Sequence, residues 1–131
     1  MTALVDANVL IRHLTGDPPE QAGRATRFLE RADKLLLPDL IVAEVAYVLE
    51  SYYEVARDQV AEALRAVLSF RATRVLDAAL LHRTVELYDL HRLDFADAYL
   101  IATAERTGIG VVASFDHDLD RVDTIRRKEP S

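Results

Sequence analysis

The sequence predicts an α/β fold, a three-layer sandwich around a central, mainly parallel sheet of four to five strands. Three observations support this prediction. Short apolar runs without alternation recur along the chain, as in strands that are covered on both faces. Longer segments with apolar residues at helical spacing follow each run. The resulting order, in which single strands alternate with pairs of helices, is typical of a parallel sheet between helical layers.

Four strands are expected from these runs. Leu4 and Val5 are predicted to lie in a buried strand, followed by strands at 34–37, 73–76 and 109–113, of which the last is the most strand-like. The segment from about residue 123 onward is polar, so we expect a frayed tail there.

Helices are predicted between the strands, and most begin at an acidic residue suited to cap them. The helix after Glu20 carries Arg24, Arg27 and Arg31 together on its outer side. The expected helices begin near Asn8, at Glu20, at Asp39 (to about Tyr52), at Ala56 (to Phe70), after Asp77 and at Asp94 (to Thr107, before Gly108).

The composition predicts one soluble domain over residues 1–131. A chain of 131 residues, 50% of them hydrophobic, can form a single core but hardly two. It has no cysteine, which excludes disulfides and thiolate metal sites and fits the reducing cytoplasm. No apolar run approaches the roughly 20 residues that span a bilayer, so no membrane association is expected.

The formal net charge of −6 argues against a simple basic protein that coats nucleic acid. It does not exclude a nucleic-acid enzyme, because a cluster of carboxylates that binds divalent cations attracts phosphate.

Acidic residues occupy equivalent places near the ends of the predicted strands. Right-handed crossovers bring such positions to one edge of a sheet, so the carboxylates are expected to converge. Converging carboxylates require a cation, and ligation by oxygen alone favours Mg²⁺ or Mn²⁺. The candidates are Asp6, Glu44, Asp94, Asp97, Asp116 and Asp118.

Each candidate also has a purely structural interpretation. Asp6, Asp94 and Asp116 can cap helices, and Asp97 suits the positive end of the helix dipole. Glu44 can belong to an exposed helix face. Only the combination of these residues favours chemistry.

Four segments that carry these acids resemble, in order and spacing, the acidic motifs of PIN-domain ribonucleases. The compact size is similar to that of VapC-type toxins of toxin-antitoxin pairs, and the resemblance spans about residues 3–122. The segments are Leu4-Val5-Asp6-Ala7-Asn8-Val9-Leu10, Pro38 to Val45 (PDLIVAEV), Asp94 to Ala102 (DFADAYLIA) and Val111 to Asp118 (VVASFDHD).

This resemblance implies a Mg²⁺- or Mn²⁺-dependent endoribonuclease. The catalytic, metal-binding quartet would be Asp6, Glu44, Asp97 and Asp116, with Asp94 and Asp118 auxiliary. Asn8 and Ser114 match the small polar positions beside the first and last acids, although the family often has Thr at the latter. The resemblance further implies a homodimer and inhibition by a small VapB-type antitoxin. Arg12 is a weaker candidate for contact with substrate phosphate.

Two other functions remain open from the sequence. Asp6 and Asn8 after a first strand are also typical of haloacid dehalogenase-type phosphohydrolases, whose first Asp is a nucleophile and which need a lysine at the site. The only lysines, Lys34 and Lys128, lie at no carboxyl end of a predicted strand, which disfavours that class and receiver domains alike. A PIN-like interaction module without metal is the non-enzymatic alternative.

Overall fold

A computed structural model describes all of residues 1–131, which form two compact units, Met1–Leu76 and Asp77–Ser131. The first unit contains a parallel three-stranded sheet in the order β1-β2-β3. Its strands are β1 (Thr2–Leu4), β2 (Lys34–Leu36) and β3 (Thr73–Arg74). Thr2 pairs with Lys34, and Leu35 pairs with Thr73.

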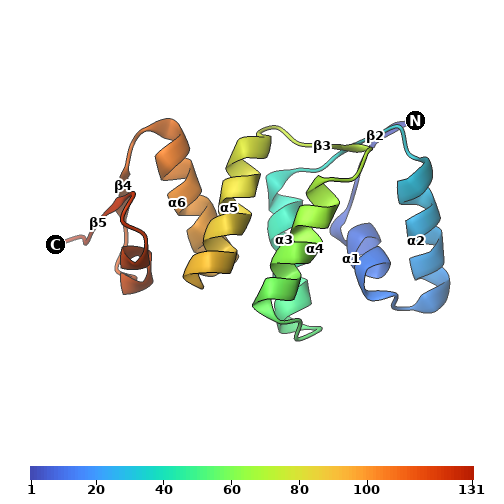
Figure 1. Cartoon of the computed structure of the whole chain (residues 1–131), viewed down its shortest axis with the longest axis horizontal. Helices are drawn as coiled ribbons and strands as arrows, with labels where there is room; N and C mark the ends of the chain where they lie inside the picture. The colour runs from blue at the N-terminus through green and yellow to red at the C-terminus, as the bar shows by residue number, and fades with distance from the viewer. The chain divides into compact units, whose positions relative to one another are not determined.

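Four helices complete the first unit. α1 packs against α2 and α3, and α3 packs against α4 (Figure 1). Each helix presents small or aliphatic side chains inward, such as Val45 and Ala46 of α3 and Val60 and Ala61 of α4, which are all fully buried. The helices are α1 (Ala7–Thr15), α2 (Pro19–Arg31), α3 (Asp39–Ser51) and α4 (Arg57–Leu68).

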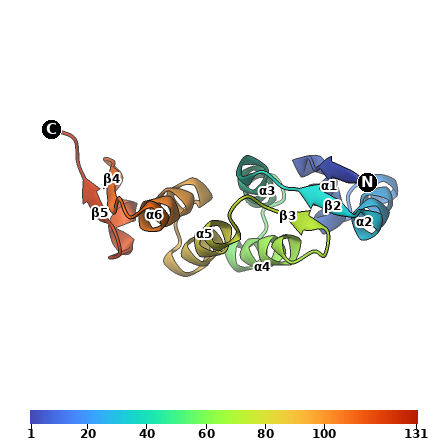
Figure 2. The same cartoon turned by 90° about the horizontal axis from the view of Figure 1, so that it is seen from above.

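The second unit is built on two long helices that lie side by side in both views of the chain (Figures 1 and 2). They are α5 (Ala78–His91) and α6 (Phe95–Thr107), and they bury Leu81, Val85 and Ile101 completely. A parallel pair of strands follows, β4 (Val111–Ala113) and β5 (Arg126–Lys128), joined through the short 3₁₀ helix η1 (His117–Arg121).

The structure confirms the predicted α/β class and its parallel strands. The five strands fall within the predicted number, but they form a three-stranded sheet and a separate pair. Several predicted helix ends are also confirmed. Asp77 accepts a hydrogen bond from the Leu80 N–H at 3.1 Å, and Gly108 ends α6 with a φ of 74°, where glycine is favoured.

Two predictions about strands were wrong. Leu4 is not buried; 68% of its surface is exposed, since β1 is an edge strand of its sheet and only Val5 beyond it enters the core. The tail is not frayed, because residues 126–128 pair with β4 as β5. Asp39 is also the first residue of α3 and not its cap, a place taken by Pro38.

Candidate functional site

Asp6 stands at the junction of β1 and α1. It is the N-cap of α1, and its Oδ1 accepts a hydrogen bond from the Ala7 N–H at 2.8 Å. The side chain is exposed, and its second oxygen accepts no hydrogen bond within the protein. The structural interpretation of Asp6 as a cap is therefore correct, and it leaves a carboxylate oxygen available to a ligand.

Glu44 lies on the exposed face of α3 and forms no ion pair. Leu40 and Tyr47, one turn away on either side, share that face and are 79% and 70% exposed. The opposite face of α3 carries the buried Val42, Val45 and Ala46. Helical periodicity thus places Glu44 outward, between the exposed side chains of Leu40 and Tyr47.

Asp94 and Asp97 open α6 in the second unit. Asp94 is the N-cap, and its Oδ1 accepts from the Asp97 N–H at 2.8 Å. Asp97 itself is half-buried. Burial, together with the nearby charges of Asp94, Asp116 and Asp118, raises the pKa of the Asp97 carboxyl to about 6. The structure therefore brings these four acids of the second unit into one neighbourhood.

Asp116 is held by a short chain of hydrogen bonds that begins at Ser114. The Ser114 Oγ accepts from the Asp116 N–H at 2.9 Å, and Asp116 Oδ1 accepts from the Asp118 N–H at 2.9 Å. Ser114 is in turn fixed to β5, because its N–H donates to the Lys128 carbonyl at 3.0 Å. Asp116 thereby caps η1 while remaining exposed. Ser114 thus positions Asp116 through the backbone.

Sequence analysis missed a second anchor of this loop, Arg127. Only 11% of the surface of its side chain is exposed, and Nη1 donates to the Ser114 carbonyl at 3.0 Å. Its Nε donates to Asp120 at 3.0 Å, which lowers the pKa of that carboxyl. The signal in the sequence is the basic run 126–128, which follows the acidic positions 116–120.

Asp118 is an exposed member of the group with a partner of its own. Its Oδ1 accepts from Arg121 Nη2 at 3.1 Å. Arg121 also donates to the Arg92 carbonyl at 2.9 Å and so ties η1 to the end of α5. Asp97 and Asp116 have no such basic partner among the ion pairs of the protein.

Asn8 and Arg12 lie in the first unit, on the side of α1 that faces α2. Both line a cavity of about 570 Å³ together with Gln21, Arg24 and Phe28. Arg12 donates to the side chain of Gln21 and to the backbone carbonyl of Asn8 and has no acidic partner. Its guanidinium is therefore available to an anion.

The quartet is divided equally between the two units. Asp6 and Glu44 belong to Met1–Leu76, and Asp97 and Asp116 belong to Asp77–Ser131. Neither unit by itself places three or more carboxylate or imidazole groups so that they could hold a metal ion. The donor set nevertheless suits a hard cation, since it consists of carboxylate oxygens, and the pKa of one of them, Asp97, is raised by burial and by neighbouring acids.

Comparison with known proteins identifies the family. The family model described as PIN domain matches residues 3–125. The chain belongs to the PIN domain family. It is also similar to the "VapC ribonuclease" of Aquifex aeolicus (strain VF5), with 27% identity over 116 residues that cover 86% of this chain and 85% of the relative. The predicted resemblance to VapC-type PIN proteins is thus confirmed, and the phosphohydrolase and receiver interpretations are not supported.

None of the helices of this PIN protein is long and apolar enough to cross a membrane. The longest, α5, has 14 residues and contains the charged side chains of Arg83, Glu86 and Asp89.

Proposed function

We propose that this PIN protein is a Mg²⁺- or Mn²⁺-dependent endoribonuclease and the toxin of a toxin-antitoxin pair. In this proposal, residues 1–131 act as one domain. Asp6, Glu44, Asp97 and Asp116 are the catalytic metal ligands, and Asp94 and Asp118 support them. Asn8 and Ser114 are auxiliary, and Arg12 contacts substrate phosphate.

One observation carries the proposal: Asp97 is half-buried at the start of α6, and its burial, together with the charges of Asp94, Asp116 and Asp118, raises the pKa of its carboxyl to about 6. Uncompensated carboxylates destabilise a protein, so an arrangement of this kind favours a function that uses them. Membership in the PIN family and the similarity to a VapC ribonuclease give that function its chemical class.

The residues suit phosphodiester hydrolysis by water. A bound divalent cation supplies a water of lowered pKa and neutralises charge on the phosphate. The four acids would hold that cation, and Asp97 must lose its proton to do so. Ser114 and the N–H of Asp118 orient Asp116, and Asp94 fixes the first turn of α6 beneath Asp97. No side chain has to act as a covalent nucleophile, and the resemblance implies products with a 5′-phosphate and a 3′-hydroxyl.

The test is cleavage of a mixture of structured and single-stranded RNAs by the full chain. We expect cleavage with Mg²⁺ or Mn²⁺, none with EDTA, and none by Asp97→Asn. The matched control is Asp123→Asn, which removes the same charge from an exposed site of the same unit that forms no ion pair.

The proposal fails if EDTA or Asp97→Asn leaves cleavage unchanged, or if a folded wild-type chain cleaves no RNA with either metal. In the second case, the non-catalytic interaction module becomes the better hypothesis. Sequencing of the new RNA ends would identify the preferred target.

Partners follow from the same proposal. We propose that the chain forms a homodimer and is inhibited in the cytoplasm by a VapB-type antitoxin. The exposed Leu40, Tyr47 and Tyr52 of the α3 region support contact with a partner protein. By contrast, α4 buries its apolar residues Val60, Leu64 and Val67.

A further inference from the structure

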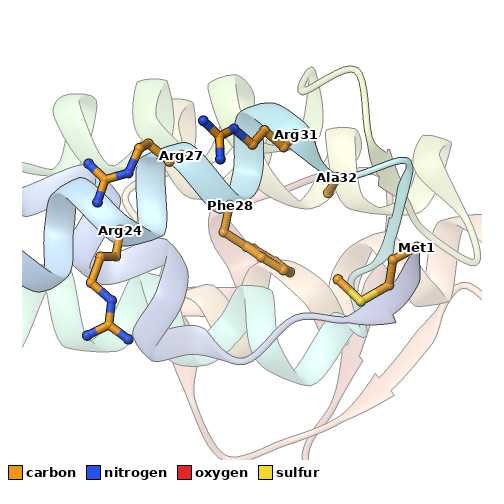
Figure 3. A pocket seen from close by; sticks show the side chains of 6 residues that line it. All are labelled: Met1, Arg24, Arg27, Phe28, Arg31 and Ala32. Carbon is orange, nitrogen blue, oxygen red and sulfur yellow. The ribbon is translucent and has the colours of Figure 1, made fainter.

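The face of α2 opposite to its core carries a row of arginines beside two adjoining cavities. Arg24, Arg27 and Arg31 recur every three to four residues and are all exposed, so they share one side of the helix. A cavity of about 310 Å³ is lined by these three side chains with Met1, Phe28 and Ala32 (Figure 3). The larger cavity that contains Asn8 and Arg12 shares Arg24 and Phe28 with it. Together these two cavities form what we call the α2 groove.

The positive charge of the α2 groove is largely uncompensated. Arg24 forms one exposed ion pair, with Glu20 at 3.5 Å, whereas Arg12, Arg27 and Arg31 form none. The remaining acid of α2, Glu30, lines a different cavity with His13 and Phe70. A chain with a net charge of −6 thus concentrates four guanidinium groups along one groove.

The α2 groove also contains an aromatic ring, that of Phe28, and Gly23 leaves space for the guanidinium of Arg27. Phe28 is half-buried, and its ring points towards Met1 beneath the helix (Figure 3). The Arg27 guanidinium lies against Gly23, where an added Cβ would be only 3.3 Å from Nη1.

We propose that the α2 groove binds the phosphate backbone of single-stranded RNA next to the cleavage site, an inference that rests on the proposed function. The groove begins at Asn8, two residues from the metal-ligand candidate Asp6, and continues along α2 to Arg31. Guanidinium groups bind phosphates, and an aromatic ring beside them gives a base a stacking surface. RNA is favoured over an acidic peptide because the row of arginines starts beside a residue of the proposed cleavage chemistry.

The test measures binding and cleavage separately. A fluorescent 12-nucleotide single-stranded RNA is titrated with the full chain in EDTA, where the proposed metal-dependent hydrolysis does not occur, over a range of KCl concentrations. The double variant Arg27→Gln/Arg31→Gln should bind about tenfold more weakly at low salt. The slope of log K against log salt should decrease in magnitude by about 1.4, since each lost contact to a single strand contributes about 0.7. In cleavage of unmodified RNA, KM should rise while kcat stays within about twofold.

The control variant is Arg126→Gln/Lys128→Gln, which removes the same two charges from exposed positions of the second unit. Its slope and KM should match those of the wild type. An equal loss in both double variants would overturn the proposal, because the effect would then reflect net charge alone. An unchanged slope for the α2 variant would also overturn it, and loss of a co-expressed antitoxin from that variant would assign the groove to a protein partner.

The two hypotheses can fail independently. If the wild type cuts RNA but the α2 variant behaves like the wild type, the ribonuclease proposal stands and the groove is wrong. If the wild type binds RNA through these arginines but cuts none, the groove stands and the catalytic proposal is wrong.

Discussion

The two halves of the proposed acidic quartet differ in how their carboxylates are buried and hydrogen-bonded. In the first unit, Asp6 caps α1 with one carboxylate oxygen, and Glu44 is exposed on α3. In the second unit, Asp97 is half-buried among three other acids, and the pKa of its carboxyl is raised to about 6. Asp6, and likewise Asp116 as the cap of η1, therefore stabilise local structure, whereas the charge of the half-buried Asp97 opposes folding.

This difference separates two effects that one substitution usually mixes. If all four acids bind the metal, removing any of them should abolish catalysis. The effect on stability should have opposite signs for Asp6 and Asp97, because Asp6 stabilises a helix and Asp97 carries an unfavourable charge. If the acids had only structural roles, their substitution would change stability in this way without abolishing catalysis.

The largest expected effect is on catalysis. Asp6→Asn and Asp97→Asn should each lower kcat at saturating Mg²⁺ by about 100-fold or more, since each removes a charged ligand of a cation that provides several kcal/mol of transition-state stabilisation. Initial rates on a fluorescent RNA substrate measure the loss. If only one of these two substitutions reduces kcat, the four acids do not bind one metal site together.

The second effect is on stability and depends on pH. Since the pKa of Asp97 is about 6 in the folded chain and about 4 in the unfolded one, the folded state binds its proton more tightly, and the free energy of unfolding decreases as pH rises from about 4 to 6. At pH 8 without metal, Asp97→Asn should be more stable than the wild type by about 1–2 kcal/mol, a value reduced for solvent screening. The advantage should disappear near pH 3.5. Urea unfolding in EDTA at both pH values measures it, and a constant difference across that range would contradict the assigned cause.

Magnesium should change the same comparison. A cation that binds only the folded chain stabilises it, so the wild type should gain stability from Mg²⁺ at pH 8. Asp97→Asn should gain much less, because it lacks one of the proposed metal ligands. It also carries no unfavourable charge at this position that the cation could neutralise. Thermal unfolding of both chains with and without Mg²⁺ measures this, and equal gains would place the cation elsewhere.

The sequence was most informative where local chemistry determines the structure. Asp6, Asp77 and Asp94 cap helices as predicted, because an Asp side chain satisfies free N–H groups in the first turn regardless of what packs around it. The order of the acidic motifs likewise identified the family. Glu44 was placed on its helix by periodicity, but its apolar neighbours Leu40 and Tyr47 are exposed and not buried.

It was least informative where a strand depends on a distant partner. β5 has the sequence Arg126-Arg127-Lys128, which no strand pattern would select. The strand forms because β4 offers a free edge and because Arg127 is paired with Asp120 and Glu129, which compensates for its burial. Neither condition can be seen in the tail alone.

The next smaller effect tests the capping role of Asp6. Asp6→Ala should lower the free energy of unfolding by about 1 kcal/mol, since it removes the acceptor at the start of α1. Asp6→Asn should keep most of that stability, because Asn caps nearly as well, while still losing catalysis. Chemical unfolding of the two variants measures the difference. Equal stability of Ala and Asn would mean that the observed hydrogen bond to Ala7 contributes little.

The smallest expected effect lies in the loop after β4. Ser114→Ala removes the hydroxyl that accepts from the Asp116 N–H, so the loop should become less ordered and the free energy of unfolding should fall by about 0.5–1 kcal/mol. Cleavage should weaken by only a few-fold, because Asp116 remains present but is less well positioned. Ser114→Thr keeps the hydroxyl and should restore both quantities, which separates an effect of the hydrogen bond from one of side-chain volume. Were Ser114→Ala as active and stable as the wild type, Asp116 would owe its position to the backbone contacts of β5 and Arg127 alone.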